Sequence, residues 1–201
     1  MSFKIGNCKV FISILFFAFI AILFMFDNTA MMGLSLLAAT LHELGHLFAM
    51  KIVNCPPYSV VLRPGAVVIN TTKTQKSYKQ DILISLSGPL INLLAACFCA
   101  LLVAIEFKNG FLTSFMWVNV ALALFNLLPT KGLDGGKILE SLLLQKLSLK
   151  SVNVTMYALT TITIFLTLST GIYIFLNDFQ SPTLLIVGVY LTVLTLLKTK
   201  K

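Results

Sequence analysis

Charged residues and histidines are scarce in this 201-residue chain, which has 15 Lys and Arg, 7 Asp and Glu, and only 2 His. Charged residues make up 11% of the sequence, against about 25% in soluble globular proteins, while hydrophobic residues make up 58%. This composition argues against a soluble domain. The four cysteines form no Cys-x-x-Cys pair, so we expect them to be small buried hydrophobic residues. The chain therefore has the composition of an integral membrane protein.

Six apolar runs are long enough, or nearly so, to cross a bilayer. They cover residues 10–26, 31–53, 82–105, 111–128, 152–176 and 182–197. With a cytoplasmic N-terminus, every one of the 15 basic residues except Lys108 lies on the cytoplasmic side, as the positive-inside rule requires. We therefore expect an all-α polytopic membrane protein with about six transmembrane helices and both termini in the cytoplasm. The net charge of +8 follows from this topology, so no nucleic-acid partner is expected.

Two segments on the cytoplasmic side interrupt the apolar pattern. Residues 58–70, YSVVLRPGAVVIN, have β-branched runs on both sides of Pro64-Gly65, which suits a type II turn and predicts a short β-hairpin. Residues 129–150 begin with a glycine-rich turn and continue as ILESLLLQKLSL, which is too short and too charged to span. That continuation predicts an interfacial amphipathic helix on the cytoplasmic side. No repeat or linker divides the chain, so we expect one domain over residues 1–201.

Both histidines fall in one pentapeptide, His42-Glu43-Leu44-Gly45-His46, inside the second apolar run. Residues four apart lie on one face of a helix, so both imidazoles can reach the same metal ion, and neutral imidazole is a good zinc ligand. Glu43 can contact a water molecule at that metal, which makes it the candidate general base. The alternative to a metal site is that both histidines are core residues, with their ring nitrogens hydrogen-bonded within the protein. The metalloprotease spacing of all three polar residues argues against it.

A catalytic zinc site needs a third protein ligand and an open position for water. Because the chain has no third His, this ligand should be Asp, Glu or Cys. Asp134, in NLLPTKGLDGG, follows a predicted helix end at Pro129, and the neighbouring glycines could let its carboxylate turn inward. From spacing alone, an ordinary Asp-Gly turn explains Asp134 equally well. The other acidic residues lie at predicted span edges or on the amphipathic helix: Asp27, Asp81, Glu106, Glu140 and Asp178.

Three motifs together resemble the site-2 protease family of intramembrane zinc metalloproteases. They are HELGH in the second apolar run, SGPLIN (87–92) in the third, and NLLPTKGLDGG (126–136) after the fourth. The family pattern often has Pro where this chain has Leu127. The resemblance covers a motif-bearing core at about residues 31–145. In layout the chain is most similar to the minimal, sporulation-protease-like group, without a PDZ or CBS domain.

The resemblance implies that His42, His46 and Asp134 bind one zinc ion per chain and that Glu43 is catalytic. It also implies substrate-binding roles for Asn126 and Asn92. Structural roles are implied for the remaining motif residues, which are Gly88, Pro89, Pro129, Gly135 and Gly136.

The expected function is hydrolysis of peptide bonds in or near transmembrane segments, for regulated intramembrane proteolysis or membrane peptide processing. The active site would lie within a cell membrane, bacterial by the compactness of the chain, and would be accessible from the cytoplasmic side. A membrane-protein or membrane-peptide substrate and the lipid bilayer are the expected partners, and regulatory subunits are left open. The alternative function is a membrane metal or ion transporter that uses the same polar residues as a transit site. The hairpin at 58–70 would either capture an extended substrate by strand addition or only pack at the cytoplasmic mouth.

Overall fold

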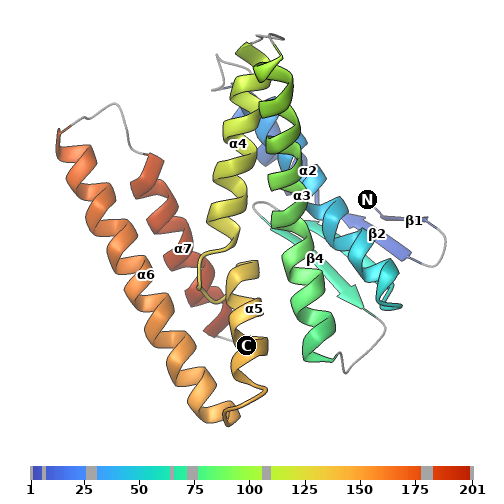
Figure 1. The fold of residues 1–201 in the computed structure, drawn as a ribbon, viewed down its shortest axis with the longest axis vertical. Coiled ribbons are helices and arrows are strands. Elements are labelled where there is room, and N and C mark those ends of the chain that lie inside the picture. Colours follow the sequence, from blue (N-terminus) through green and yellow to red (C-terminus); the bar gives the residue numbers. More distant parts are fainter. Residues whose placement is uncertain are drawn as a thin grey trace. The chain divides into compact units, whose positions relative to one another are not determined.

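The computed structural model describes residues 2–5, 8–25, 31–63, 66–71, 77–105, 110–177 and 183–199. The chain forms two compact units, Met1–Leu124 and Phe125–Lys201. The first unit holds a small sheet and helices α1, α2, α3 and most of α4, and the second holds α5, α6 and α7 (Figure 1). The described residues are mainly helical, which agrees with the predicted architecture at this coarse level.

A four-stranded sheet lies in the first unit, with the strands in chain order. The pairs β1–β2 and β3–β4 are antiparallel, whereas β2 and β3 are parallel. The hairpin predicted over residues 58–70 is confirmed by the β3–β4 pair, but its predicted turn at Pro64-Gly65 lies outside the described residues. The strands are β1 (Ser2–Ile5), β2 (Cys8–Ile12), β3 (Pro57–Arg63) and β4 (Ala66–Thr71).

The two N-terminal strands were not predicted; they add to the sheet of a mainly helical fold and correct the start of the first predicted span, 10–26. Its first residues belong to β2, and helix α1 occupies only Ile14–Met25. A short apolar run is ambiguous between strand and helix by pattern alone. Here the hydrogen bonds to β3 make Cys8–Ile12 a strand. The residues that follow α1 lie outside the described part of the chain, so a crossing of the bilayer by this helix stays a prediction.

Helices α2 (Met31–Ile52) and α3 (Tyr78–Ala104) approach each other closely enough that a glycine is required where they meet. A Cβ atom on Gly45 would lie 2.8 Å from the carbonyl oxygen of Ser87 and 3.2 Å from the Cα of Gly88. Backbone atoms cannot move aside as a flexible side chain can, so a larger residue at this position would push the helices apart. The close contact fixes the face of α2 that carries His42 and His46 against α3.

Two apolar clusters stabilise this arrangement at either end of the histidine pair. One joins buried residues of α2 and α3 to helix α4 (Gly110–Asn126), and the other lies near the sheet. The clusters consist of Leu34, Ala38, Cys99 and Phe115, and of Ala49, Met50 and Ile84.

The second unit contains α5 (Asp134–Leu143), α6 (Leu149–Asn177) and α7 (Thr183–Thr199). Helices α6 and α7 pack together at a glycine, since a Cβ on Gly171 would lie 2.8 Å from the backbone nitrogen of Leu185. Helix α5 lies within the predicted amphipathic segment, although it begins directly at Asp134 and is short. Its interfacial, cytoplasmic position stays a prediction.

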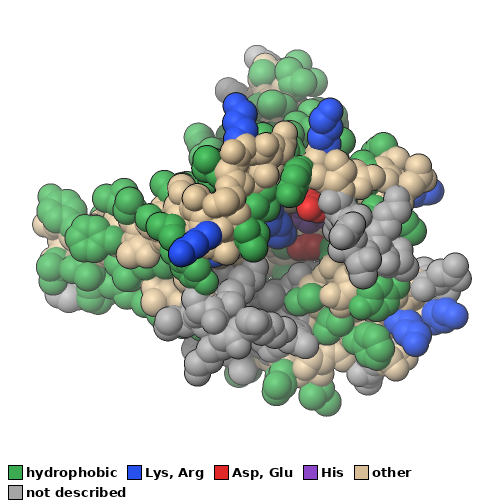
Figure 2. All heavy atoms as spheres, turned by 90° about the horizontal axis from the view of Figure 1, so that it is seen from below, with side chains coloured by type: hydrophobic (Ala, Val, Ile, Leu, Met, Phe, Trp, Pro, Cys, Tyr) green, Lys and Arg blue, Asp and Glu red, His purple; other side chains and the backbone are tan. Residues whose placement is uncertain are grey.

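Two of the described helices, α3 and α6, are long and apolar enough to cross a membrane. Shorter apolar helices cover Gly110–Asn126 and Leu184–Val193. Large hydrophobic side chains are exposed along both long helices, and Figure 2 shows such side chains over much of one face, with Lys and Arg at separate points. These features are compatible with a membrane protein. The count of six spans stays a prediction.

Candidate metal site

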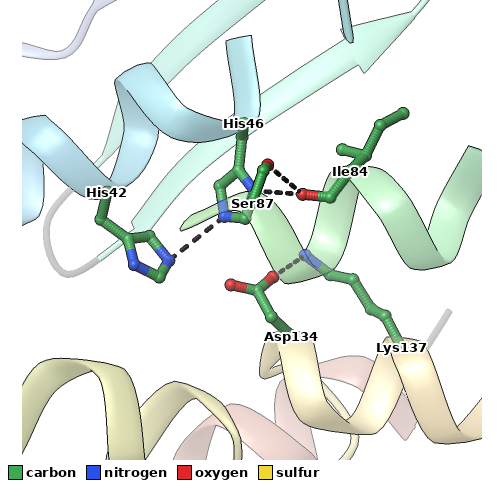
Figure 3. A network of polar contacts seen from close by, with 6 residues as sticks. All are labelled: His42, His46, Ile84, Ser87, Asp134 and Lys137. Carbon is green, nitrogen blue, oxygen red and sulfur yellow. Dashed lines mark hydrogen bonds and ion pairs between the residues drawn. The ribbon is translucent and has the colours of Figure 1, made fainter. Parts of the chain in front are cut away.

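The two histidines of the first unit face each other on one side of α2. Both are buried, with 6% of His42 and 8% of His46 exposed. Their rings lie nearly perpendicular, at 88°, with the two Nε2 atoms 3.2 Å apart (Figure 3). The prediction that residues four apart on a helix bring both imidazoles to one point is therefore confirmed.

The other nitrogen of each ring lies against an oxygen atom. His42 Nδ1 is 2.6 Å from Asn92 Oδ1, and His46 Nδ1 is 2.7 Å from the carbonyl oxygen of Ile84, which also accepts a hydrogen bond from the Ser87 hydroxyl (Figure 3). Oxygens of this kind only accept hydrogen bonds, so each Nδ1 carries the hydrogen and donates it. A neutral ring in this tautomer presents an unprotonated Nε2. Two such nitrogens 3.2 Å apart, each with an oxygen acceptor behind its Nδ1, form a donor set that suits a metal ion.

A glycine on α3 keeps space open at this face of the histidine pair. A Cβ on Gly88 would lie 2.6 Å from His46 Nε2 and 2.7 Å from His42 Nε2. The next residue, Pro89, is buried and has no backbone N–H to donate to the carbonyl of Ser85. Gly88 of the third-helix motif thus lies directly beside the two Nε2 atoms, while the structural roles that the resemblance implies for Gly88 and Pro89 stay predictions.

Glu43 and Asn126 lie at the predicted places in the chain, and both are partly buried. Glu43 follows His42 on α2, while Asn126 is the last residue of α4 and belongs to the second unit. Their predicted roles as general base and substrate contact stay predictions.

The second unit supplies the candidate carboxylate, at the end of a tight loop. Helix α4 ends at Asn126, before Pro129, as the sequence predicted. Gly132 has a φ of 118°, a conformation that side chains rarely allow. Cβ atoms on Gly135 and Gly136 would collide with the backbone carbonyls of Leu127 and Thr130, so the loop folds directly over the first turn of α5.

Lys131 anchors this loop to helix α6. Its backbone N–H donates to the Thr160 hydroxyl at 3.0 Å, and its Nζ donates to Asn153 Oδ1 at 3.0 Å. The same Nζ lies 3.6 Å from the ring centroid of Tyr157, within cation–π distance. Three contacts to three residues of one helix fix the position of the loop. The residue that follows the loop, Asp134, is therefore held on a rigid support.

The Asp134 side chain is buried, with the residue only 3% exposed, and its Oδ1 accepts a hydrogen bond from Lys137 Nζ at 2.9 Å (Figure 3). Asp134 also begins α5, where the partial positive charge of the helix N-terminus stabilises a carboxylate. Lys137 is half-exposed, so this ion pair is partly screened by solvent. A buried, ionised carboxylate held in this way is a suitable zinc ligand.

We expect Gly135→Ala to destabilise the protein by about 1–3 kcal/mol, the usual range for overpacking, because the added methyl group overlaps the Leu127 carbonyl. The measurement is thermal unfolding of the purified protein in detergent. Gly110→Ala is the matched control, since a Cβ there has nothing within 4 Å. Equal melting temperatures for the two variants would contradict the tight packing of the loop.

Sequence reasoning missed two groups near the histidines, one that bonds Asn92 beside His42 and one that contacts His46. One is Asn119, which is fully buried on α4 and hydrogen-bonded to Asn92. A polar residue inside the apolar run 111–128 is a signal that could have identified it. The other is the carbonyl of Ile84, which is a backbone group and leaves no trace in the sequence.

Comparison with known proteins finds the same resemblance as the sequence motifs. The sequence model of Peptidase family M50 matches residues 105–169, which include the 126–136 motif but not the two histidines. A curated zinc metalloprotease of Methanocaldococcus jannaschii is 30% identical over 115 residues, which cover 54% of this chain and 33% of that protein. The chain thus spans about a third of the length of that relative.

The fold also has a counterpart among solved structures. A site-2 protease from Methanocaldococcus jannaschii matches with a TM-score of 0.59 and 24% sequence identity, over 95% of this chain and 92% of that one. These matches confirm the resemblance to the site-2 protease family, peptidase family M50, that the three sequence motifs predicted.

Proposed function

We propose that the chain is an intramembrane zinc metalloprotease that hydrolyses peptide bonds in or near transmembrane segments of membrane-bound substrates. One observation carries the proposal: two buried imidazoles present their Nε2 atoms to each other at 3.2 Å, each with its Nδ1 against an oxygen acceptor. The similarity to peptidases favours this function over the metal or ion transporter that the polar residues alone left open.

The proposed zinc ligands are His42, His46 and Asp134, with one ion per chain. Each of these side chains is buried and offers one ligand atom of a type that zinc accepts. Two imidazole nitrogens and one carboxylate oxygen leave the fourth position of a tetrahedral site for water or substrate, as catalytic zinc requires. Gly88 is proposed to keep this space clear, while Pro129, Gly135 and Gly136 hold the Asp134 loop.

Glu43 is the proposed general base. Its carboxylate would take a proton from the attacking water and later deliver it to the leaving amine. When bound, zinc supplies a Lewis acid for the scissile carbonyl and makes the attacking water more acidic. Asn126, at the end of α4, is proposed to contact the substrate. The same contact stays a prediction for Asn92, whose amide is fully buried and bonded to protein atoms.

The proposed topology has six spans with both termini in the cytoplasm. The pairing of β2 with β3 supports one element of it, because α1 and α2 lie between these strands in the chain. If both helices cross the bilayer, the chain returns to the side from which it left, and the whole sheet lies there. Lys4, Lys9 and Lys51 would then share the cytoplasmic side, in line with the positive-inside rule.

Membrane proteins or membrane peptides are the proposed substrates, cleaved from the cytoplasmic side by a single domain over residues 1–201. A helical substrate hides its carbonyls in hydrogen bonds, so it must unwind locally before attack. Strand β4 lies at one edge of the sheet and could pair with such an extended segment. Packing at the cytoplasmic mouth stays the alternative role for the hairpin.

The zinc content of detergent-purified protein tests the proposed site. We expect about one zinc per wild-type chain, and a several-fold lower content in Asp134→Ala because the third ligand is gone. Glu140→Ala, which removes another acidic side chain of the same helix, should keep the wild-type content. A folded wild-type protein that binds no zinc would overturn the proposed function. Equal contents in the two variants would show that Asp134 is not a ligand.

A further inference from the structure

We propose that Asn119, on helix α4, is a positioning residue for the metal site, and that it acts on His42 through Asn92. This inference rests on the proposed zinc site. It starts from two amide side chains that are both completely buried, with 0% exposure each, in the mainly apolar helices α3 and α4. Buried amides must bond all of their polar atoms to avoid an unfavourable free energy, so the direction of each amide can be determined from its neighbours.

The amide of Asn119 is oriented by its own helix. Its Nδ2 donates to the backbone carbonyl of Phe115 at 2.8 Å, one turn earlier. Because that carbonyl can only accept, the nitrogen must face it, and Oδ1 must point away from it. In this direction Oδ1 accepts a hydrogen bond from Asn92 Nδ2 at 2.7 Å.

The amide of Asn92 is oriented by two acceptors at once. Its Nδ2 donates to Asn119 Oδ1 and, at 3.0 Å, to the backbone carbonyl of Ala38 on α2. Both amide hydrogens are then in use, and Oδ1 is left to face His42 Nδ1 at 2.6 Å. A flipped amide would place its oxygen against two acceptors and its NH₂ group against a ring N–H. Asn119 and Ala38 together therefore determine which atom His42 meets.

This direction matters because it sets the tautomer of His42. An acceptor at Nδ1 keeps the hydrogen there and leaves Nε2 with the lone pair that a metal needs. His46 needs no such arrangement, since its acceptor is the backbone carbonyl of Ile84 and cannot rotate. His42 Nδ1, in contrast, faces an acceptor on a rotatable side chain, that of Asn92. The hydrogen bonds that orient it run from α2 through α3 to α4.

The test is the zinc dissociation constant of the full chain in detergent, measured by competition with a chromogenic chelator. Asn119→Leu keeps the side-chain size and removes the acceptor, and we expect zinc binding to weaken about 10-fold, at the low end of the range for residues that orient metal ligands. Asn92→Leu acts directly on His42 and should weaken it by about 10- to 100-fold. Asn119→Asp keeps an oxygen toward Asn92 and should bind zinc more tightly than Asn119→Leu.

A double variant separates positioning from general packing. Because Asn119 acts through Asn92, the pair Asn92→Leu and Asn119→Leu together should weaken binding no more than Asn92→Leu alone. The visible spectrum of the cobalt-substituted protein should also change in Asn119→Leu, because the ring of His42 is no longer held. Phe115→Leu is the control, since it alters the same buried part of α4 without touching the amides. It should leave both readouts as in the wild type.

The outcomes are distinguishable. Wild-type protein without zinc overturns the proposed function itself. Zinc binding in the wild type, with Asn119→Leu indistinguishable from Phe115→Leu, overturns only the role of Asn119. Fully additive losses in the double variant do the same, because they would mean that Asn119 does not act through Asn92. If Asn119→Leu fails to fold, Asn119→Ala takes its place, because it also removes the acceptor, and zinc binding as in Phe115→Leu then overturns the role of Asn119.

Discussion

Glu43→Gln should slow cleavage by about 10²- to 10⁴-fold and leave the zinc content at about one ion per chain. Glutamine has almost the same shape as glutamate but cannot accept the proton of the attacking water. General acid–base catalysis by one positioned side chain typically contributes about 10²- to 10⁴-fold to a rate, so the loss should fall in that range. Zinc is measured by elemental analysis, and cleavage by single-turnover assays on a panel of tagged transmembrane peptides reconstituted with the protein.

The control for this result is Glu140→Gln, an identical chemical change on the partly buried face of α5. It should keep both zinc and cleavage. A wild-type cleavage rate in Glu43→Gln would mean that another group transfers the proton. Loss of zinc in Glu43→Gln would instead mean that Glu43 is itself a ligand, and the division of roles proposed for HELGH would be wrong.

Gly88→Ala should remove zinc almost completely from a protein that still folds. The added methyl group would lie 2.6 Å from His46 Nε2 and 2.7 Å from His42 Nε2, closer than carbon and nitrogen atoms can approach. The imidazole rings are side chains and can swing aside, so the helices need not separate. The swing moves the Nε2 atoms apart, however, and a zinc ion requires both at about 2.0–2.1 Å. We therefore expect at least a 100-fold loss of affinity, the upper end of the range for residues that orient metal ligands.

Gly33→Ala is the matched control, because a Cβ at that position on α2 meets nothing within 4 Å. It should leave the zinc content unchanged. Circular dichroism and size-exclusion chromatography show whether both variants fold. Full zinc content in folded Gly88→Ala would mean that the two Nε2 atoms do not bind the metal from the positions described.

The sequence was sufficient for the parts of the site that follow from helical periodicity. Two histidines four residues apart had to face one point once α2 was a helix, and Pro129 had to end α4 before the loop. Of the three glycines around Asp134, Gly132 uses the predicted backbone freedom, whereas Gly135 and Gly136 are needed for close packing.

The remaining features depend on contacts between residues distant in the chain. The strand at Cys8–Ile12 forms because β3 lies beside it, and an apolar run carries no information about a partner more than 40 residues away. The role of Asn119 depends on Asn92, which is 27 residues earlier and on another helix. Sequence pattern identifies such a residue as unusual for its surroundings, but only the packed helices show which group it bonds.

The crossing of α2 and α3 has a consequence for how a substrate could enter. At Gly45 the two helices contact each other through backbone atoms, which on α3 are Ser87 O and Gly88 Cα. Rotation of a side chain therefore cannot increase the distance between the helices at this point. Sliding or twisting of either helix would first have to break this contact and would separate the histidines from the groups that orient them. Helices α2 and α3 therefore behave as one rigid unit. Any movement that admits a bulky polypeptide has to be made by other elements of the chain.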